Sequence, residues 1–118
     1  MGRLACGTLL VAAIAAVLGQ VGRHEFVDFD DTTYVVENPR LREGFRAGGI
    51  IRDCTSPYYL NWHPLTSLSF RVDYALYGLE PAGYLGTNVA LHALAALALF
   101  LEIMQQLASY RSGLALGR

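Results

Sequence analysis

The sequence has 118 residues, of which 53% are hydrophobic and 16% are charged, with a net charge of -1 and a mean hydropathy of +0.32. This composition is too apolar for an ordinary soluble domain of that length. The charge argues against a nucleic-acid partner, because phosphate binding needs a basic surface and the chain contains no basic run. We therefore interpret the sequence as that of a membrane protein.

The first long uncharged stretch covers residues 4–22, with Thr8 and Gln20 as its only polar side chains. Its length approaches the roughly 20 residues that a helix needs to cross the hydrocarbon core. An amino-terminal Met-Gly-Arg followed by an apolar run is also typical of a secretory signal peptide. A second apolar stretch favours a retained anchor, so residues 1–22 are predicted to form transmembrane helix 1, or a signal anchor.

Residues 23–83 form a polar segment that is predicted to be a loop with its own helices. Pro39, Pro57 and Pro64 interrupt it, and after the last of these the apolar side chains recur at helical spacing beside an aromatic stripe: Leu65, Leu68, Val72 and Leu76, then Phe70, Tyr74 and Tyr77. With Arg71 and Asp73 expected on the remaining surface, this pattern favours a helix lying in the membrane interface. A helix of a small globular domain is the alternative. Residues 41–53 are predicted to form a shorter helix, which its glycines weaken.

The second uncharged stretch, residues 81–101, predicts transmembrane helix 2 over residues 84–108, followed by a short tail, residues 109–118. Asn88, His92 and Glu102 fall within a wedge of roughly 80° on this helix. Polar groups inside a membrane tend to face protein or a water-filled path. Asn88 and His92 are therefore candidate substrate-binding residues; the alternative is that they hydrogen-bond to a neighbouring span while Glu102 lies at the cytoplasmic surface.

The distribution of charged residues predicts how the chain is oriented in the membrane. All nine basic residues are arginines, and the segment between the spans holds six of them against nine acids. Arg3 precedes the first span, whereas Arg111 and Arg118 follow the second, so the positive-inside tendency places both termini in the cytoplasm. Residues 23–83 are then expected on the non-cytoplasmic side.

Four short runs follow one another at residues 29–39, 61–66, 70–84 and 87–94. The first contains Asp30-Asp31, and the second reads Asn-Trp-His-Pro-Leu-Thr. In this order, over about residues 26–104, the chain resembles the start of the transmembrane and tetratricopeptide-repeat O-mannosyltransferase-like proteins and their bacterial relatives. Those proteins belong to the GT-C class of multi-span glycosyltransferases, which take a sugar from a polyprenyl-phosphate donor on the non-cytoplasmic side.

The resemblance implies that Asp30 and Asp31 match the acidic motif of the first loop in that class. A carboxylate there can take the proton of an acceptor hydroxyl as it attacks the sugar. Both acids could instead bind a divalent cation, Mg²⁺ or Mn²⁺, so that they are also candidate metal ligands. The structural alternative is an acid pair that caps the turn after the first span. His63 could bind a phosphate or a sugar, or be a structural histidine in a turn.

Together these expectations describe an all-α membrane protein with two transmembrane helices joined by a non-cytoplasmic loop with interfacial helices. We expect an integral protein of a bacterial inner membrane, with the loop in the periplasm or outside. Its expected role is the amino-terminal part of a GT-C glycosyltransferase, with mannose as a candidate sugar and without activity of its own. Its expected partners are the lipid bilayer, the polyprenyl-phosphate donor and the rest of a transferase. The alternative is a non-catalytic two-span membrane interaction or assembly protein.

Overall fold

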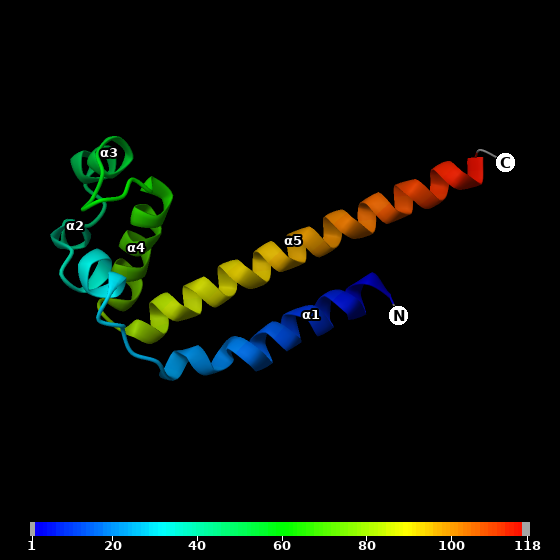
Figure 1. Ribbon diagram of the computed structural model, residues 1–118, viewed down its shortest axis with the longest axis horizontal. Helices are drawn as coiled ribbons and strands as arrows, with labels where there is room; N and C mark the ends of the chain where they lie inside the picture. The colour runs from blue at the N-terminus through cyan, green and yellow to red at the C-terminus, as the bar shows by residue number, and fades with distance from the viewer. Residues whose placement is uncertain (1, 117–118) are drawn as a thin grey trace. The chain divides into compact units, whose positions relative to one another are not determined.

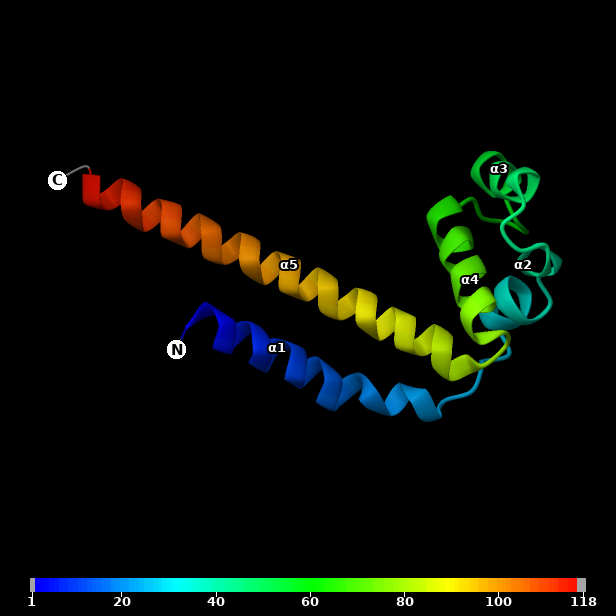
Figure 2. The same cartoon turned by 180° about the vertical axis from the view of Figure 1, so that it is seen from behind.

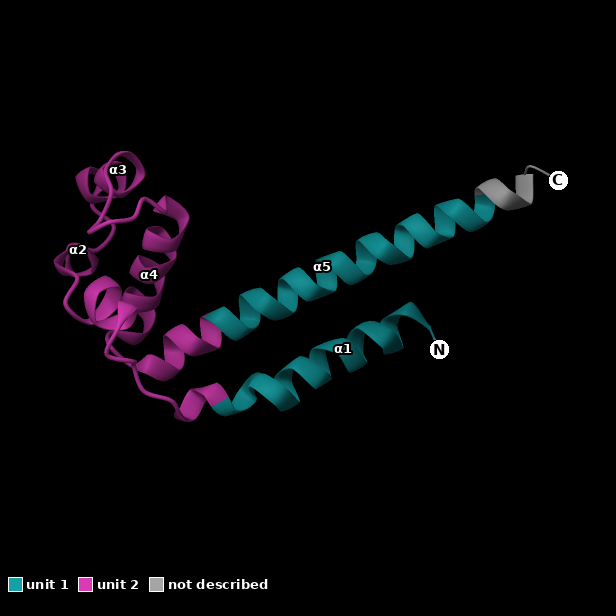
Figure 3. Ribbon diagram, viewed as in Figure 1, with its two compact units in different colours: residues 1–20, 88–118 teal, residues 21–87 magenta. Residues whose placement is uncertain are grey.

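The computed structural model describes residues 2–116, and within them every regular element is a helix (Figure 1). The chain divides into two compact units (Figure 3). Unit 1 contains residues 1–20 and 88–118, and unit 2 contains residues 21–87. The all-helical class predicted from the sequence is confirmed for the described residues.

Unit 1 consists of α1, Arg3–Leu18, and most of α5, Pro81–Leu116, which run side by side in Figure 1 and Figure 2. Gly7 of α1 lies beside α5: a Cβ there would be in ordinary van der Waals contact with Leu97 Cδ1, at 3.4 Å, and with Phe100 Cε1, at 3.8 Å. A 3-10 turn, η1 (Gly19–Arg23), extends α1. Residues 3–23 and 81–112 are each long and apolar enough to cross a membrane, as the sequence predicted.

The second long helix ends later than expected. The sequence predicted a tail from residue 109, but α5 continues without a break to Leu116. Ala108, Ser109 and Tyr110 are all compatible with a helix and no proline or glycine interrupts them, so nothing local ends the helix there. Residues 117 and 118, including the Arg118 used to predict the orientation, lie outside the described residues.

Unit 2 contains the short helices η2, Thr32–Val36, and α2, Pro39–Arg42, followed by α3, Ala47–Thr55, and α4, Pro64–Tyr77. Helix α4 packs against both α2 and α3. The apolar core is small: Val35, Leu41 and Tyr84 are buried, with Phe26, Phe70 and Tyr74 packed against them. So few apolar groups leave much of the packing in this unit to polar contacts.

The shorter helix predicted over residues 41–53 is two helices. Asn38 begins α2, and its Oδ1 accepts a hydrogen bond from the Arg40 backbone N–H at 3.0 Å, with Pro39 in the first turn. The chain then breaks at Gly44, whose φ of 64° is readily accessible only to glycine. The break places the Gly44 carbonyl 2.5 Å from Arg71 Nη1.

The predicted exposure of Arg71 and Asp73 on α4 is wrong. Arg71 is 1% exposed and Asp73 is 3% exposed. Burial is tolerated because each finds a polar partner: Arg71 Nε donates to Asp53 Oδ2 at 2.6 Å, and Asp73 Oδ1 accepts from Thr87 Oγ1 at 2.6 Å. Helix α4 therefore buries its charges and leaves apolar side chains outside: Leu65, Val72 and Leu76.

Candidate functional site

The acid pair lies at the start of a helical turn that continues as the π-helical segment η2. Asp31 Oδ2 accepts a hydrogen bond from the Val27 backbone N–H at 2.9 Å, and Asp28 Oδ1 accepts one from Thr32 Oγ1 at 2.9 Å. Asp30 is exposed, and within the described residues its carboxylate accepts no hydrogen bond. The neighbouring acids thus fix the turn, whereas the Asp30 carboxylate is left exposed.

Tyr34 connects this turn to the segment that precedes α4. Its hydroxyl accepts a hydrogen bond from Asn61 Nδ2 at 2.7 Å. Its ring lies 5.3 Å from the His63 ring and 5.9 Å from the Tyr58 ring, between centroids. Tyr34 follows Asp31 by three residues, so the structure brings the acid-pair turn and the His63 segment into one neighbourhood.

His63 is half-buried and immediately precedes Pro64, the first residue of α4. Its Nδ1 atom is buried and has no hydrogen-bond partner among the described residues. A buried ring nitrogen without a partner is uncommon in proteins. In this structure the atom has no accessible surface, and the Tyr34 ring packs beside the imidazole.

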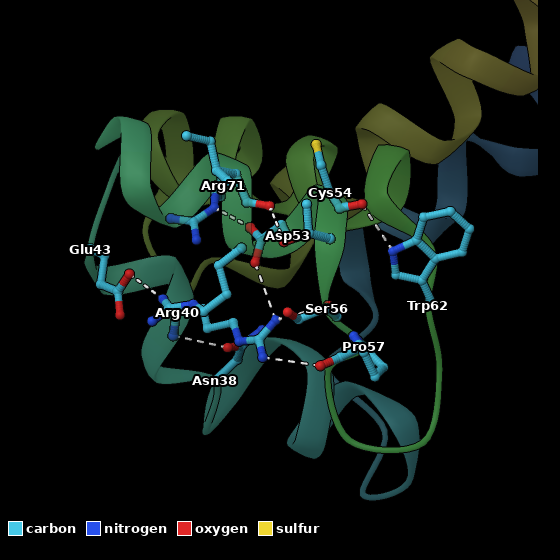
Figure 4. Close-up of polar contacts among 12 residues, drawn as sticks. Asn38, Arg40, Glu43, Asp53, Cys54, Ser56, Pro57, Trp62 and Arg71 are labelled. Carbon is cyan, nitrogen blue, oxygen red and sulfur yellow. Dashed lines mark hydrogen bonds and ion pairs between the residues drawn. The ribbon is translucent and has the colours of Figure 1, made fainter.

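A buried ion network holds the segment that carries His63 (Figure 4). Asp53 is shared by two arginines, at 2.6 Å from Arg71 Nε and 3.4 Å from Arg40 Nη1. Arg40 Nη2 also donates to the Pro57 carbonyl at 3.0 Å, and its guanidinium lies 4.9 Å above the Tyr58 ring. This network fixes the start of the connection between α3 and α4.

Three further features lie beside the network. A Cβ on Gly49 would lie 3.1 Å from Arg71 Nη2 and 3.2 Å from Glu43 Oε2, so a larger residue there would require the Arg71 and Glu43 side chains to shift. Glu43 pairs with Arg52, and the hydrogen bond from Arg52 holds the pKa of the Glu43 carboxyl below its usual range. Trp62 Nε1 donates to the Cys54 carbonyl at 3.2 Å, which ties the Trp-His-Pro run to the end of α3.

Sequence reasoning missed this network. The available signal was the pair Arg71 and Asp73, two charged side chains in a helix whose other residues from Pro64 to Tyr77 carry none. Charged residues in such a setting are often paired inside a protein. Their partners, Asp53 and Thr87, lie 18 and 14 residues away and were not visible from local spacing.

Asn88 and His92 are exposed residues of α5 and belong to unit 1, whereas Asp30, Asp31 and His63 belong to unit 2. The catalytic and substrate-binding roles suggested for these residues stay predictions. A cleft of about 570 Å³ in unit 2 includes neither acid of the pair in its lining, which consists of Gly22, Arg23, His24, Glu25, Phe26, Glu80 and Pro81.

The acid pair was also predicted as a metal site. The described residues contain no group of three or more His, Cys, Asp or Glu side chains that could hold a metal ion. Mg²⁺ commonly takes only one or two protein carboxylates and completes its shell with water and substrate phosphates. Asp30 offers such a carboxylate, and Asp31 offers one oxygen besides the atom bonded to Val27. The residues present would hold a hard cation only together with a phosphate ligand.

Comparison with known proteins found one similarity that bears on the site. Over 101 residues, the chain is 35% identical to Protein O-mannosyl-transferase TMTC1 of Mus musculus. The matched region is 77% of this chain and 10% of the relative, so the chain spans about a tenth of that protein's length. No family model and no solved structure matches the chain. The similarity supports in part the resemblance to the transmembrane and tetratricopeptide-repeat O-mannosyltransferase-like proteins.

Proposed function

We propose that this chain is the first part of a GT-C membrane glycosyltransferase that moves a sugar, with mannose as the candidate, from a polyprenyl-phosphate donor to a hydroxyl acceptor. Its similarity to a protein O-mannosyl-transferase supports the reaction class. The observation that carries the proposal is the exposed carboxylate of Asp30 on a turn that Asp28 and Asp31 hold in place. Such an arrangement presents one acid to a substrate while the others keep the backbone fixed.

In this mechanism Asp30 accepts the proton of the acceptor hydroxyl as its oxygen bonds to the anomeric carbon. The bond from that carbon to the phosphate oxygen breaks, and the polyprenyl phosphate leaves with the electron pair. Asp31 positions the turn through its hydrogen bond to Val27, and His63 is the candidate contact for the sugar or the phosphate. In the alternative in which Asp30 and Asp31 hold a divalent cation instead, that cation would supply charge neutralisation at the leaving phosphate.

The reaction class requires residues 23–83 on the non-cytoplasmic side, which in a bacterium is the periplasmic face of the inner membrane. The outward apolar side chains of α4 favour a position in the membrane interface, and α5 begins at Pro81, shortly after α4 ends at Tyr77. In a chain whose native Cys6 and Cys54 are replaced, a cysteine introduced at Glu43 should then react with a membrane-impermeant reagent from outside, and one at Arg111 should react only after permeabilisation. The reverse pattern would contradict the proposed orientation.

The activity test compares membranes that contain the full-length protein with Asp30→Asn, Asp31→Asn or Asp28→Asn at equal abundance. The measured quantity is transfer of mannose from a polyprenyl-phosphate donor to a hydroxyl-bearing peptide. Asparagine keeps the shape of the side chain but cannot accept the proton, so Asp30→Asn should lower the rate by about 10²–10⁴-fold. Asp31→Asn should cost less, because its amide oxygen can still accept the hydrogen bond from Val27.

Asp28→Asn is the matched control, since Asp28 is also anchored in the turn but has no proposed contact with substrate. Normal turnover by the double variant Asp30→Asn/Asp31→Asn would rule out the catalytic role. A loss with Asp28→Asn as large as that with Asp30→Asn would assign all three acids to maintaining the turn.

A non-catalytic interaction or assembly protein is the second candidate function. The exposed polar residues of α5, including Asn88 and His92, favour it, because polar groups on a membrane helix usually contact another protein segment. Partner binding that persists in a chain without transfer activity would support this function over the first.

A further inference from the structure

Seven exposed residues of α5 alternate at spacings of four and three, and we call them the polar seam: Asn88, His92, Ala95, Leu99, Glu102, Gln106 and Ser109. At 3.6 residues per turn they cover roughly 100° of the helix circumference. Five of them carry hydrogen-bonding side chains. Spacings of four and three average 3.5 residues, which is the repeat of the contact residues where two helices pack along their length.

Helix α1 does not cover the polar seam. The residues of α5 beside Gly7 of α1 are Leu97 and Phe100. A cavity of about 560 Å³ in unit 1 is lined on the α5 side by Leu97, Phe100 and Leu101. These residues lie on roughly the opposite side of α5 from the seam. In a membrane the seam would face lipid, which is unfavourable for amide, imidazole and carboxylate groups, unless another protein segment covers it.

The chemistry of the seam is largely self-complementary. The amides of Asn88 and Gln106 and the imidazole of His92 each donate and accept hydrogen bonds. In two copies inserted with the same orientation, identical residues of α5 lie at the same depth and meet across a two-fold axis. Each of these groups can therefore be satisfied by its own counterpart.

The remaining seam residues fit the same arrangement. Gln106 Nε2 donates to Glu102 Oε1 at 2.9 Å, so that the one acid of the seam already has a hydrogen-bond donor. Glu102 lies roughly 40° from the centre of the seam, which moves the two carboxylates away from the axis. Ala95, near the middle of the seam, has a side chain small enough for close approach of two helices.

We propose that the polar seam of α5 is the contact surface for a second copy of this chain, which pairs with it as a parallel two-helix contact in the membrane. The pairing leaves the opposite, α1-facing side of α5 undisturbed. It goes beyond the proposed transferase function: the surface belongs to unit 1, involves none of the proposed catalytic acids, and assigns Asn88 and His92 to helix pairing in place of the substrate binding predicted from the sequence.

Cysteine crosslinking of the full chain in phosphatidylcholine vesicles tests the pairing. The two native cysteines, Cys6 and Cys54, are first replaced by Ala and Ser. A single cysteine is then introduced as Leu99→Cys, in the seam, or as Leu94→Cys, outside it. These leucines are a matched pair, because Leu99 is 62% exposed and Leu94 is 63% exposed in the same helix, about 140° apart.

On oxidation, Leu99→Cys should form a disulfide-linked dimer and Leu94→Cys should stay mainly monomeric. In a lipid dilution series, removing the amide with Asn88→Ala or Gln106→Ala should weaken dimerisation by about 3- to 10-fold. Leu94→Ala should leave it unchanged, and circular dichroism of each variant checks that α5 stays helical. Equal crosslinking at both leucines, or monomers at both, would overturn the proposal.

Discussion

In unit 1 the long apolar side chains point outward, whereas in unit 2 the most buried large side chain is an arginine. Leu4 is 88% exposed and Leu94 is 63% exposed in unit 1, while Arg71 in unit 2 is 1% exposed. In water the exposed apolar side chains of unit 1 would be unfavourable, because contact between apolar surface and water raises the free energy. In lipid the same surface carries no cost, so the exposed face of unit 1 indicates that this unit is stable in lipid.

Unit 2 depends on buried polar contacts because its apolar core is small. Among the described residues, the buried cluster consists of Val35, Leu41 and Tyr84, while Asp53, Arg71 and Asp73 are buried with hydrogen-bond partners. A buried ion pair is weak evidence of net stabilisation, but breaking one by removing a single partner is strongly destabilising. Stability should therefore respond most to polar substitutions in unit 2.

The largest effect is expected for Asp53→Ala, which leaves Arg40 and Arg71 without their shared carboxylate. The free energy of unfolding of unit 2 should fall by about 3–5 kcal/mol. Urea titration of the full chain in detergent micelles measures it through Trp62, the only tryptophan of the sequence, which belongs to unit 2. Asp30→Ala, an exposed control, should change it by less than about 0.5 kcal/mol. Equal effects of the two substitutions would contradict the importance of the network.

Substitutions at two adjacent glycines test whether the contact with Arg71 matters for the stability of unit 2. Gly49→Val should destabilise unit 2 by about 1–3 kcal/mol, because its side chain would displace the Arg71 guanidinium. Gly48→Ala meets no atom within 4 Å and should stabilise α3 by up to about 1 kcal/mol. The same urea titration compares them. Loss of stability in both variants would show that the helix itself, and not the contact with Arg71, is sensitive at these positions.

The smallest effect is expected at Glu43, which is partly exposed and bonded to Arg52. Because its folded-state pKa is depressed below 4.5, the carboxylate stabilises the fold above that pH and loses its contribution as the pH falls further. The urea midpoint of the native chain should fall slightly more than that of Glu43→Gln between pH 7 and acid. Added salt should reduce this difference, since exposed pairs are screened.

Local sequence signals predicted the helices, but they did not predict which polar side chains contact one another between helices. The apolar stretches and Pro64 located α1, α4 and α5, because length, periodicity and proline act locally. The burial of Arg71 could not be predicted, since it depends on Asp53 in another helix and on the space left by Gly49. The break at Gly44 was likewise not predicted, because residues 41–53 were expected to form one helix.

The sequence indicated which residues belong to the candidate site, but it did not indicate how these residues are arranged in space. Asp30 and Asp31 were identified by the motif, and a structural role was the stated alternative for the pair. The structure separates the two acids: Asp31 bonds back to Val27, and Asp30 stays exposed. Proximity of His63 to the turn depends on the ring of Tyr34, a contact across 29 residues that no local pattern reveals.

Helix α4 is where the two environments of this chain are expected to meet. Its Arg71 and Asp73 are buried, and the only other ionisable side chains between Ser56 and Leu79 belong to His63 and to tyrosines. The exposed surface of that stretch carries apolar and aromatic side chains, including Trp62 at 61% exposure. Aromatic side chains of this kind prefer the interface between lipid and water.

Fluorescence quenching of Trp62 in the full chain, reconstituted in vesicles, tests this central claim most directly. Lipids brominated near the headgroup end of the acyl chain should quench Trp62 more than lipids brominated near the bilayer centre, and aqueous iodide should quench it weakly. The control Trp62→Phe/Arg46→Trp moves the fluorophore to an exposed, charged part of unit 2, where iodide should dominate. Strong quenching of Trp62 by iodide, with none by any brominated lipid, would contradict the account.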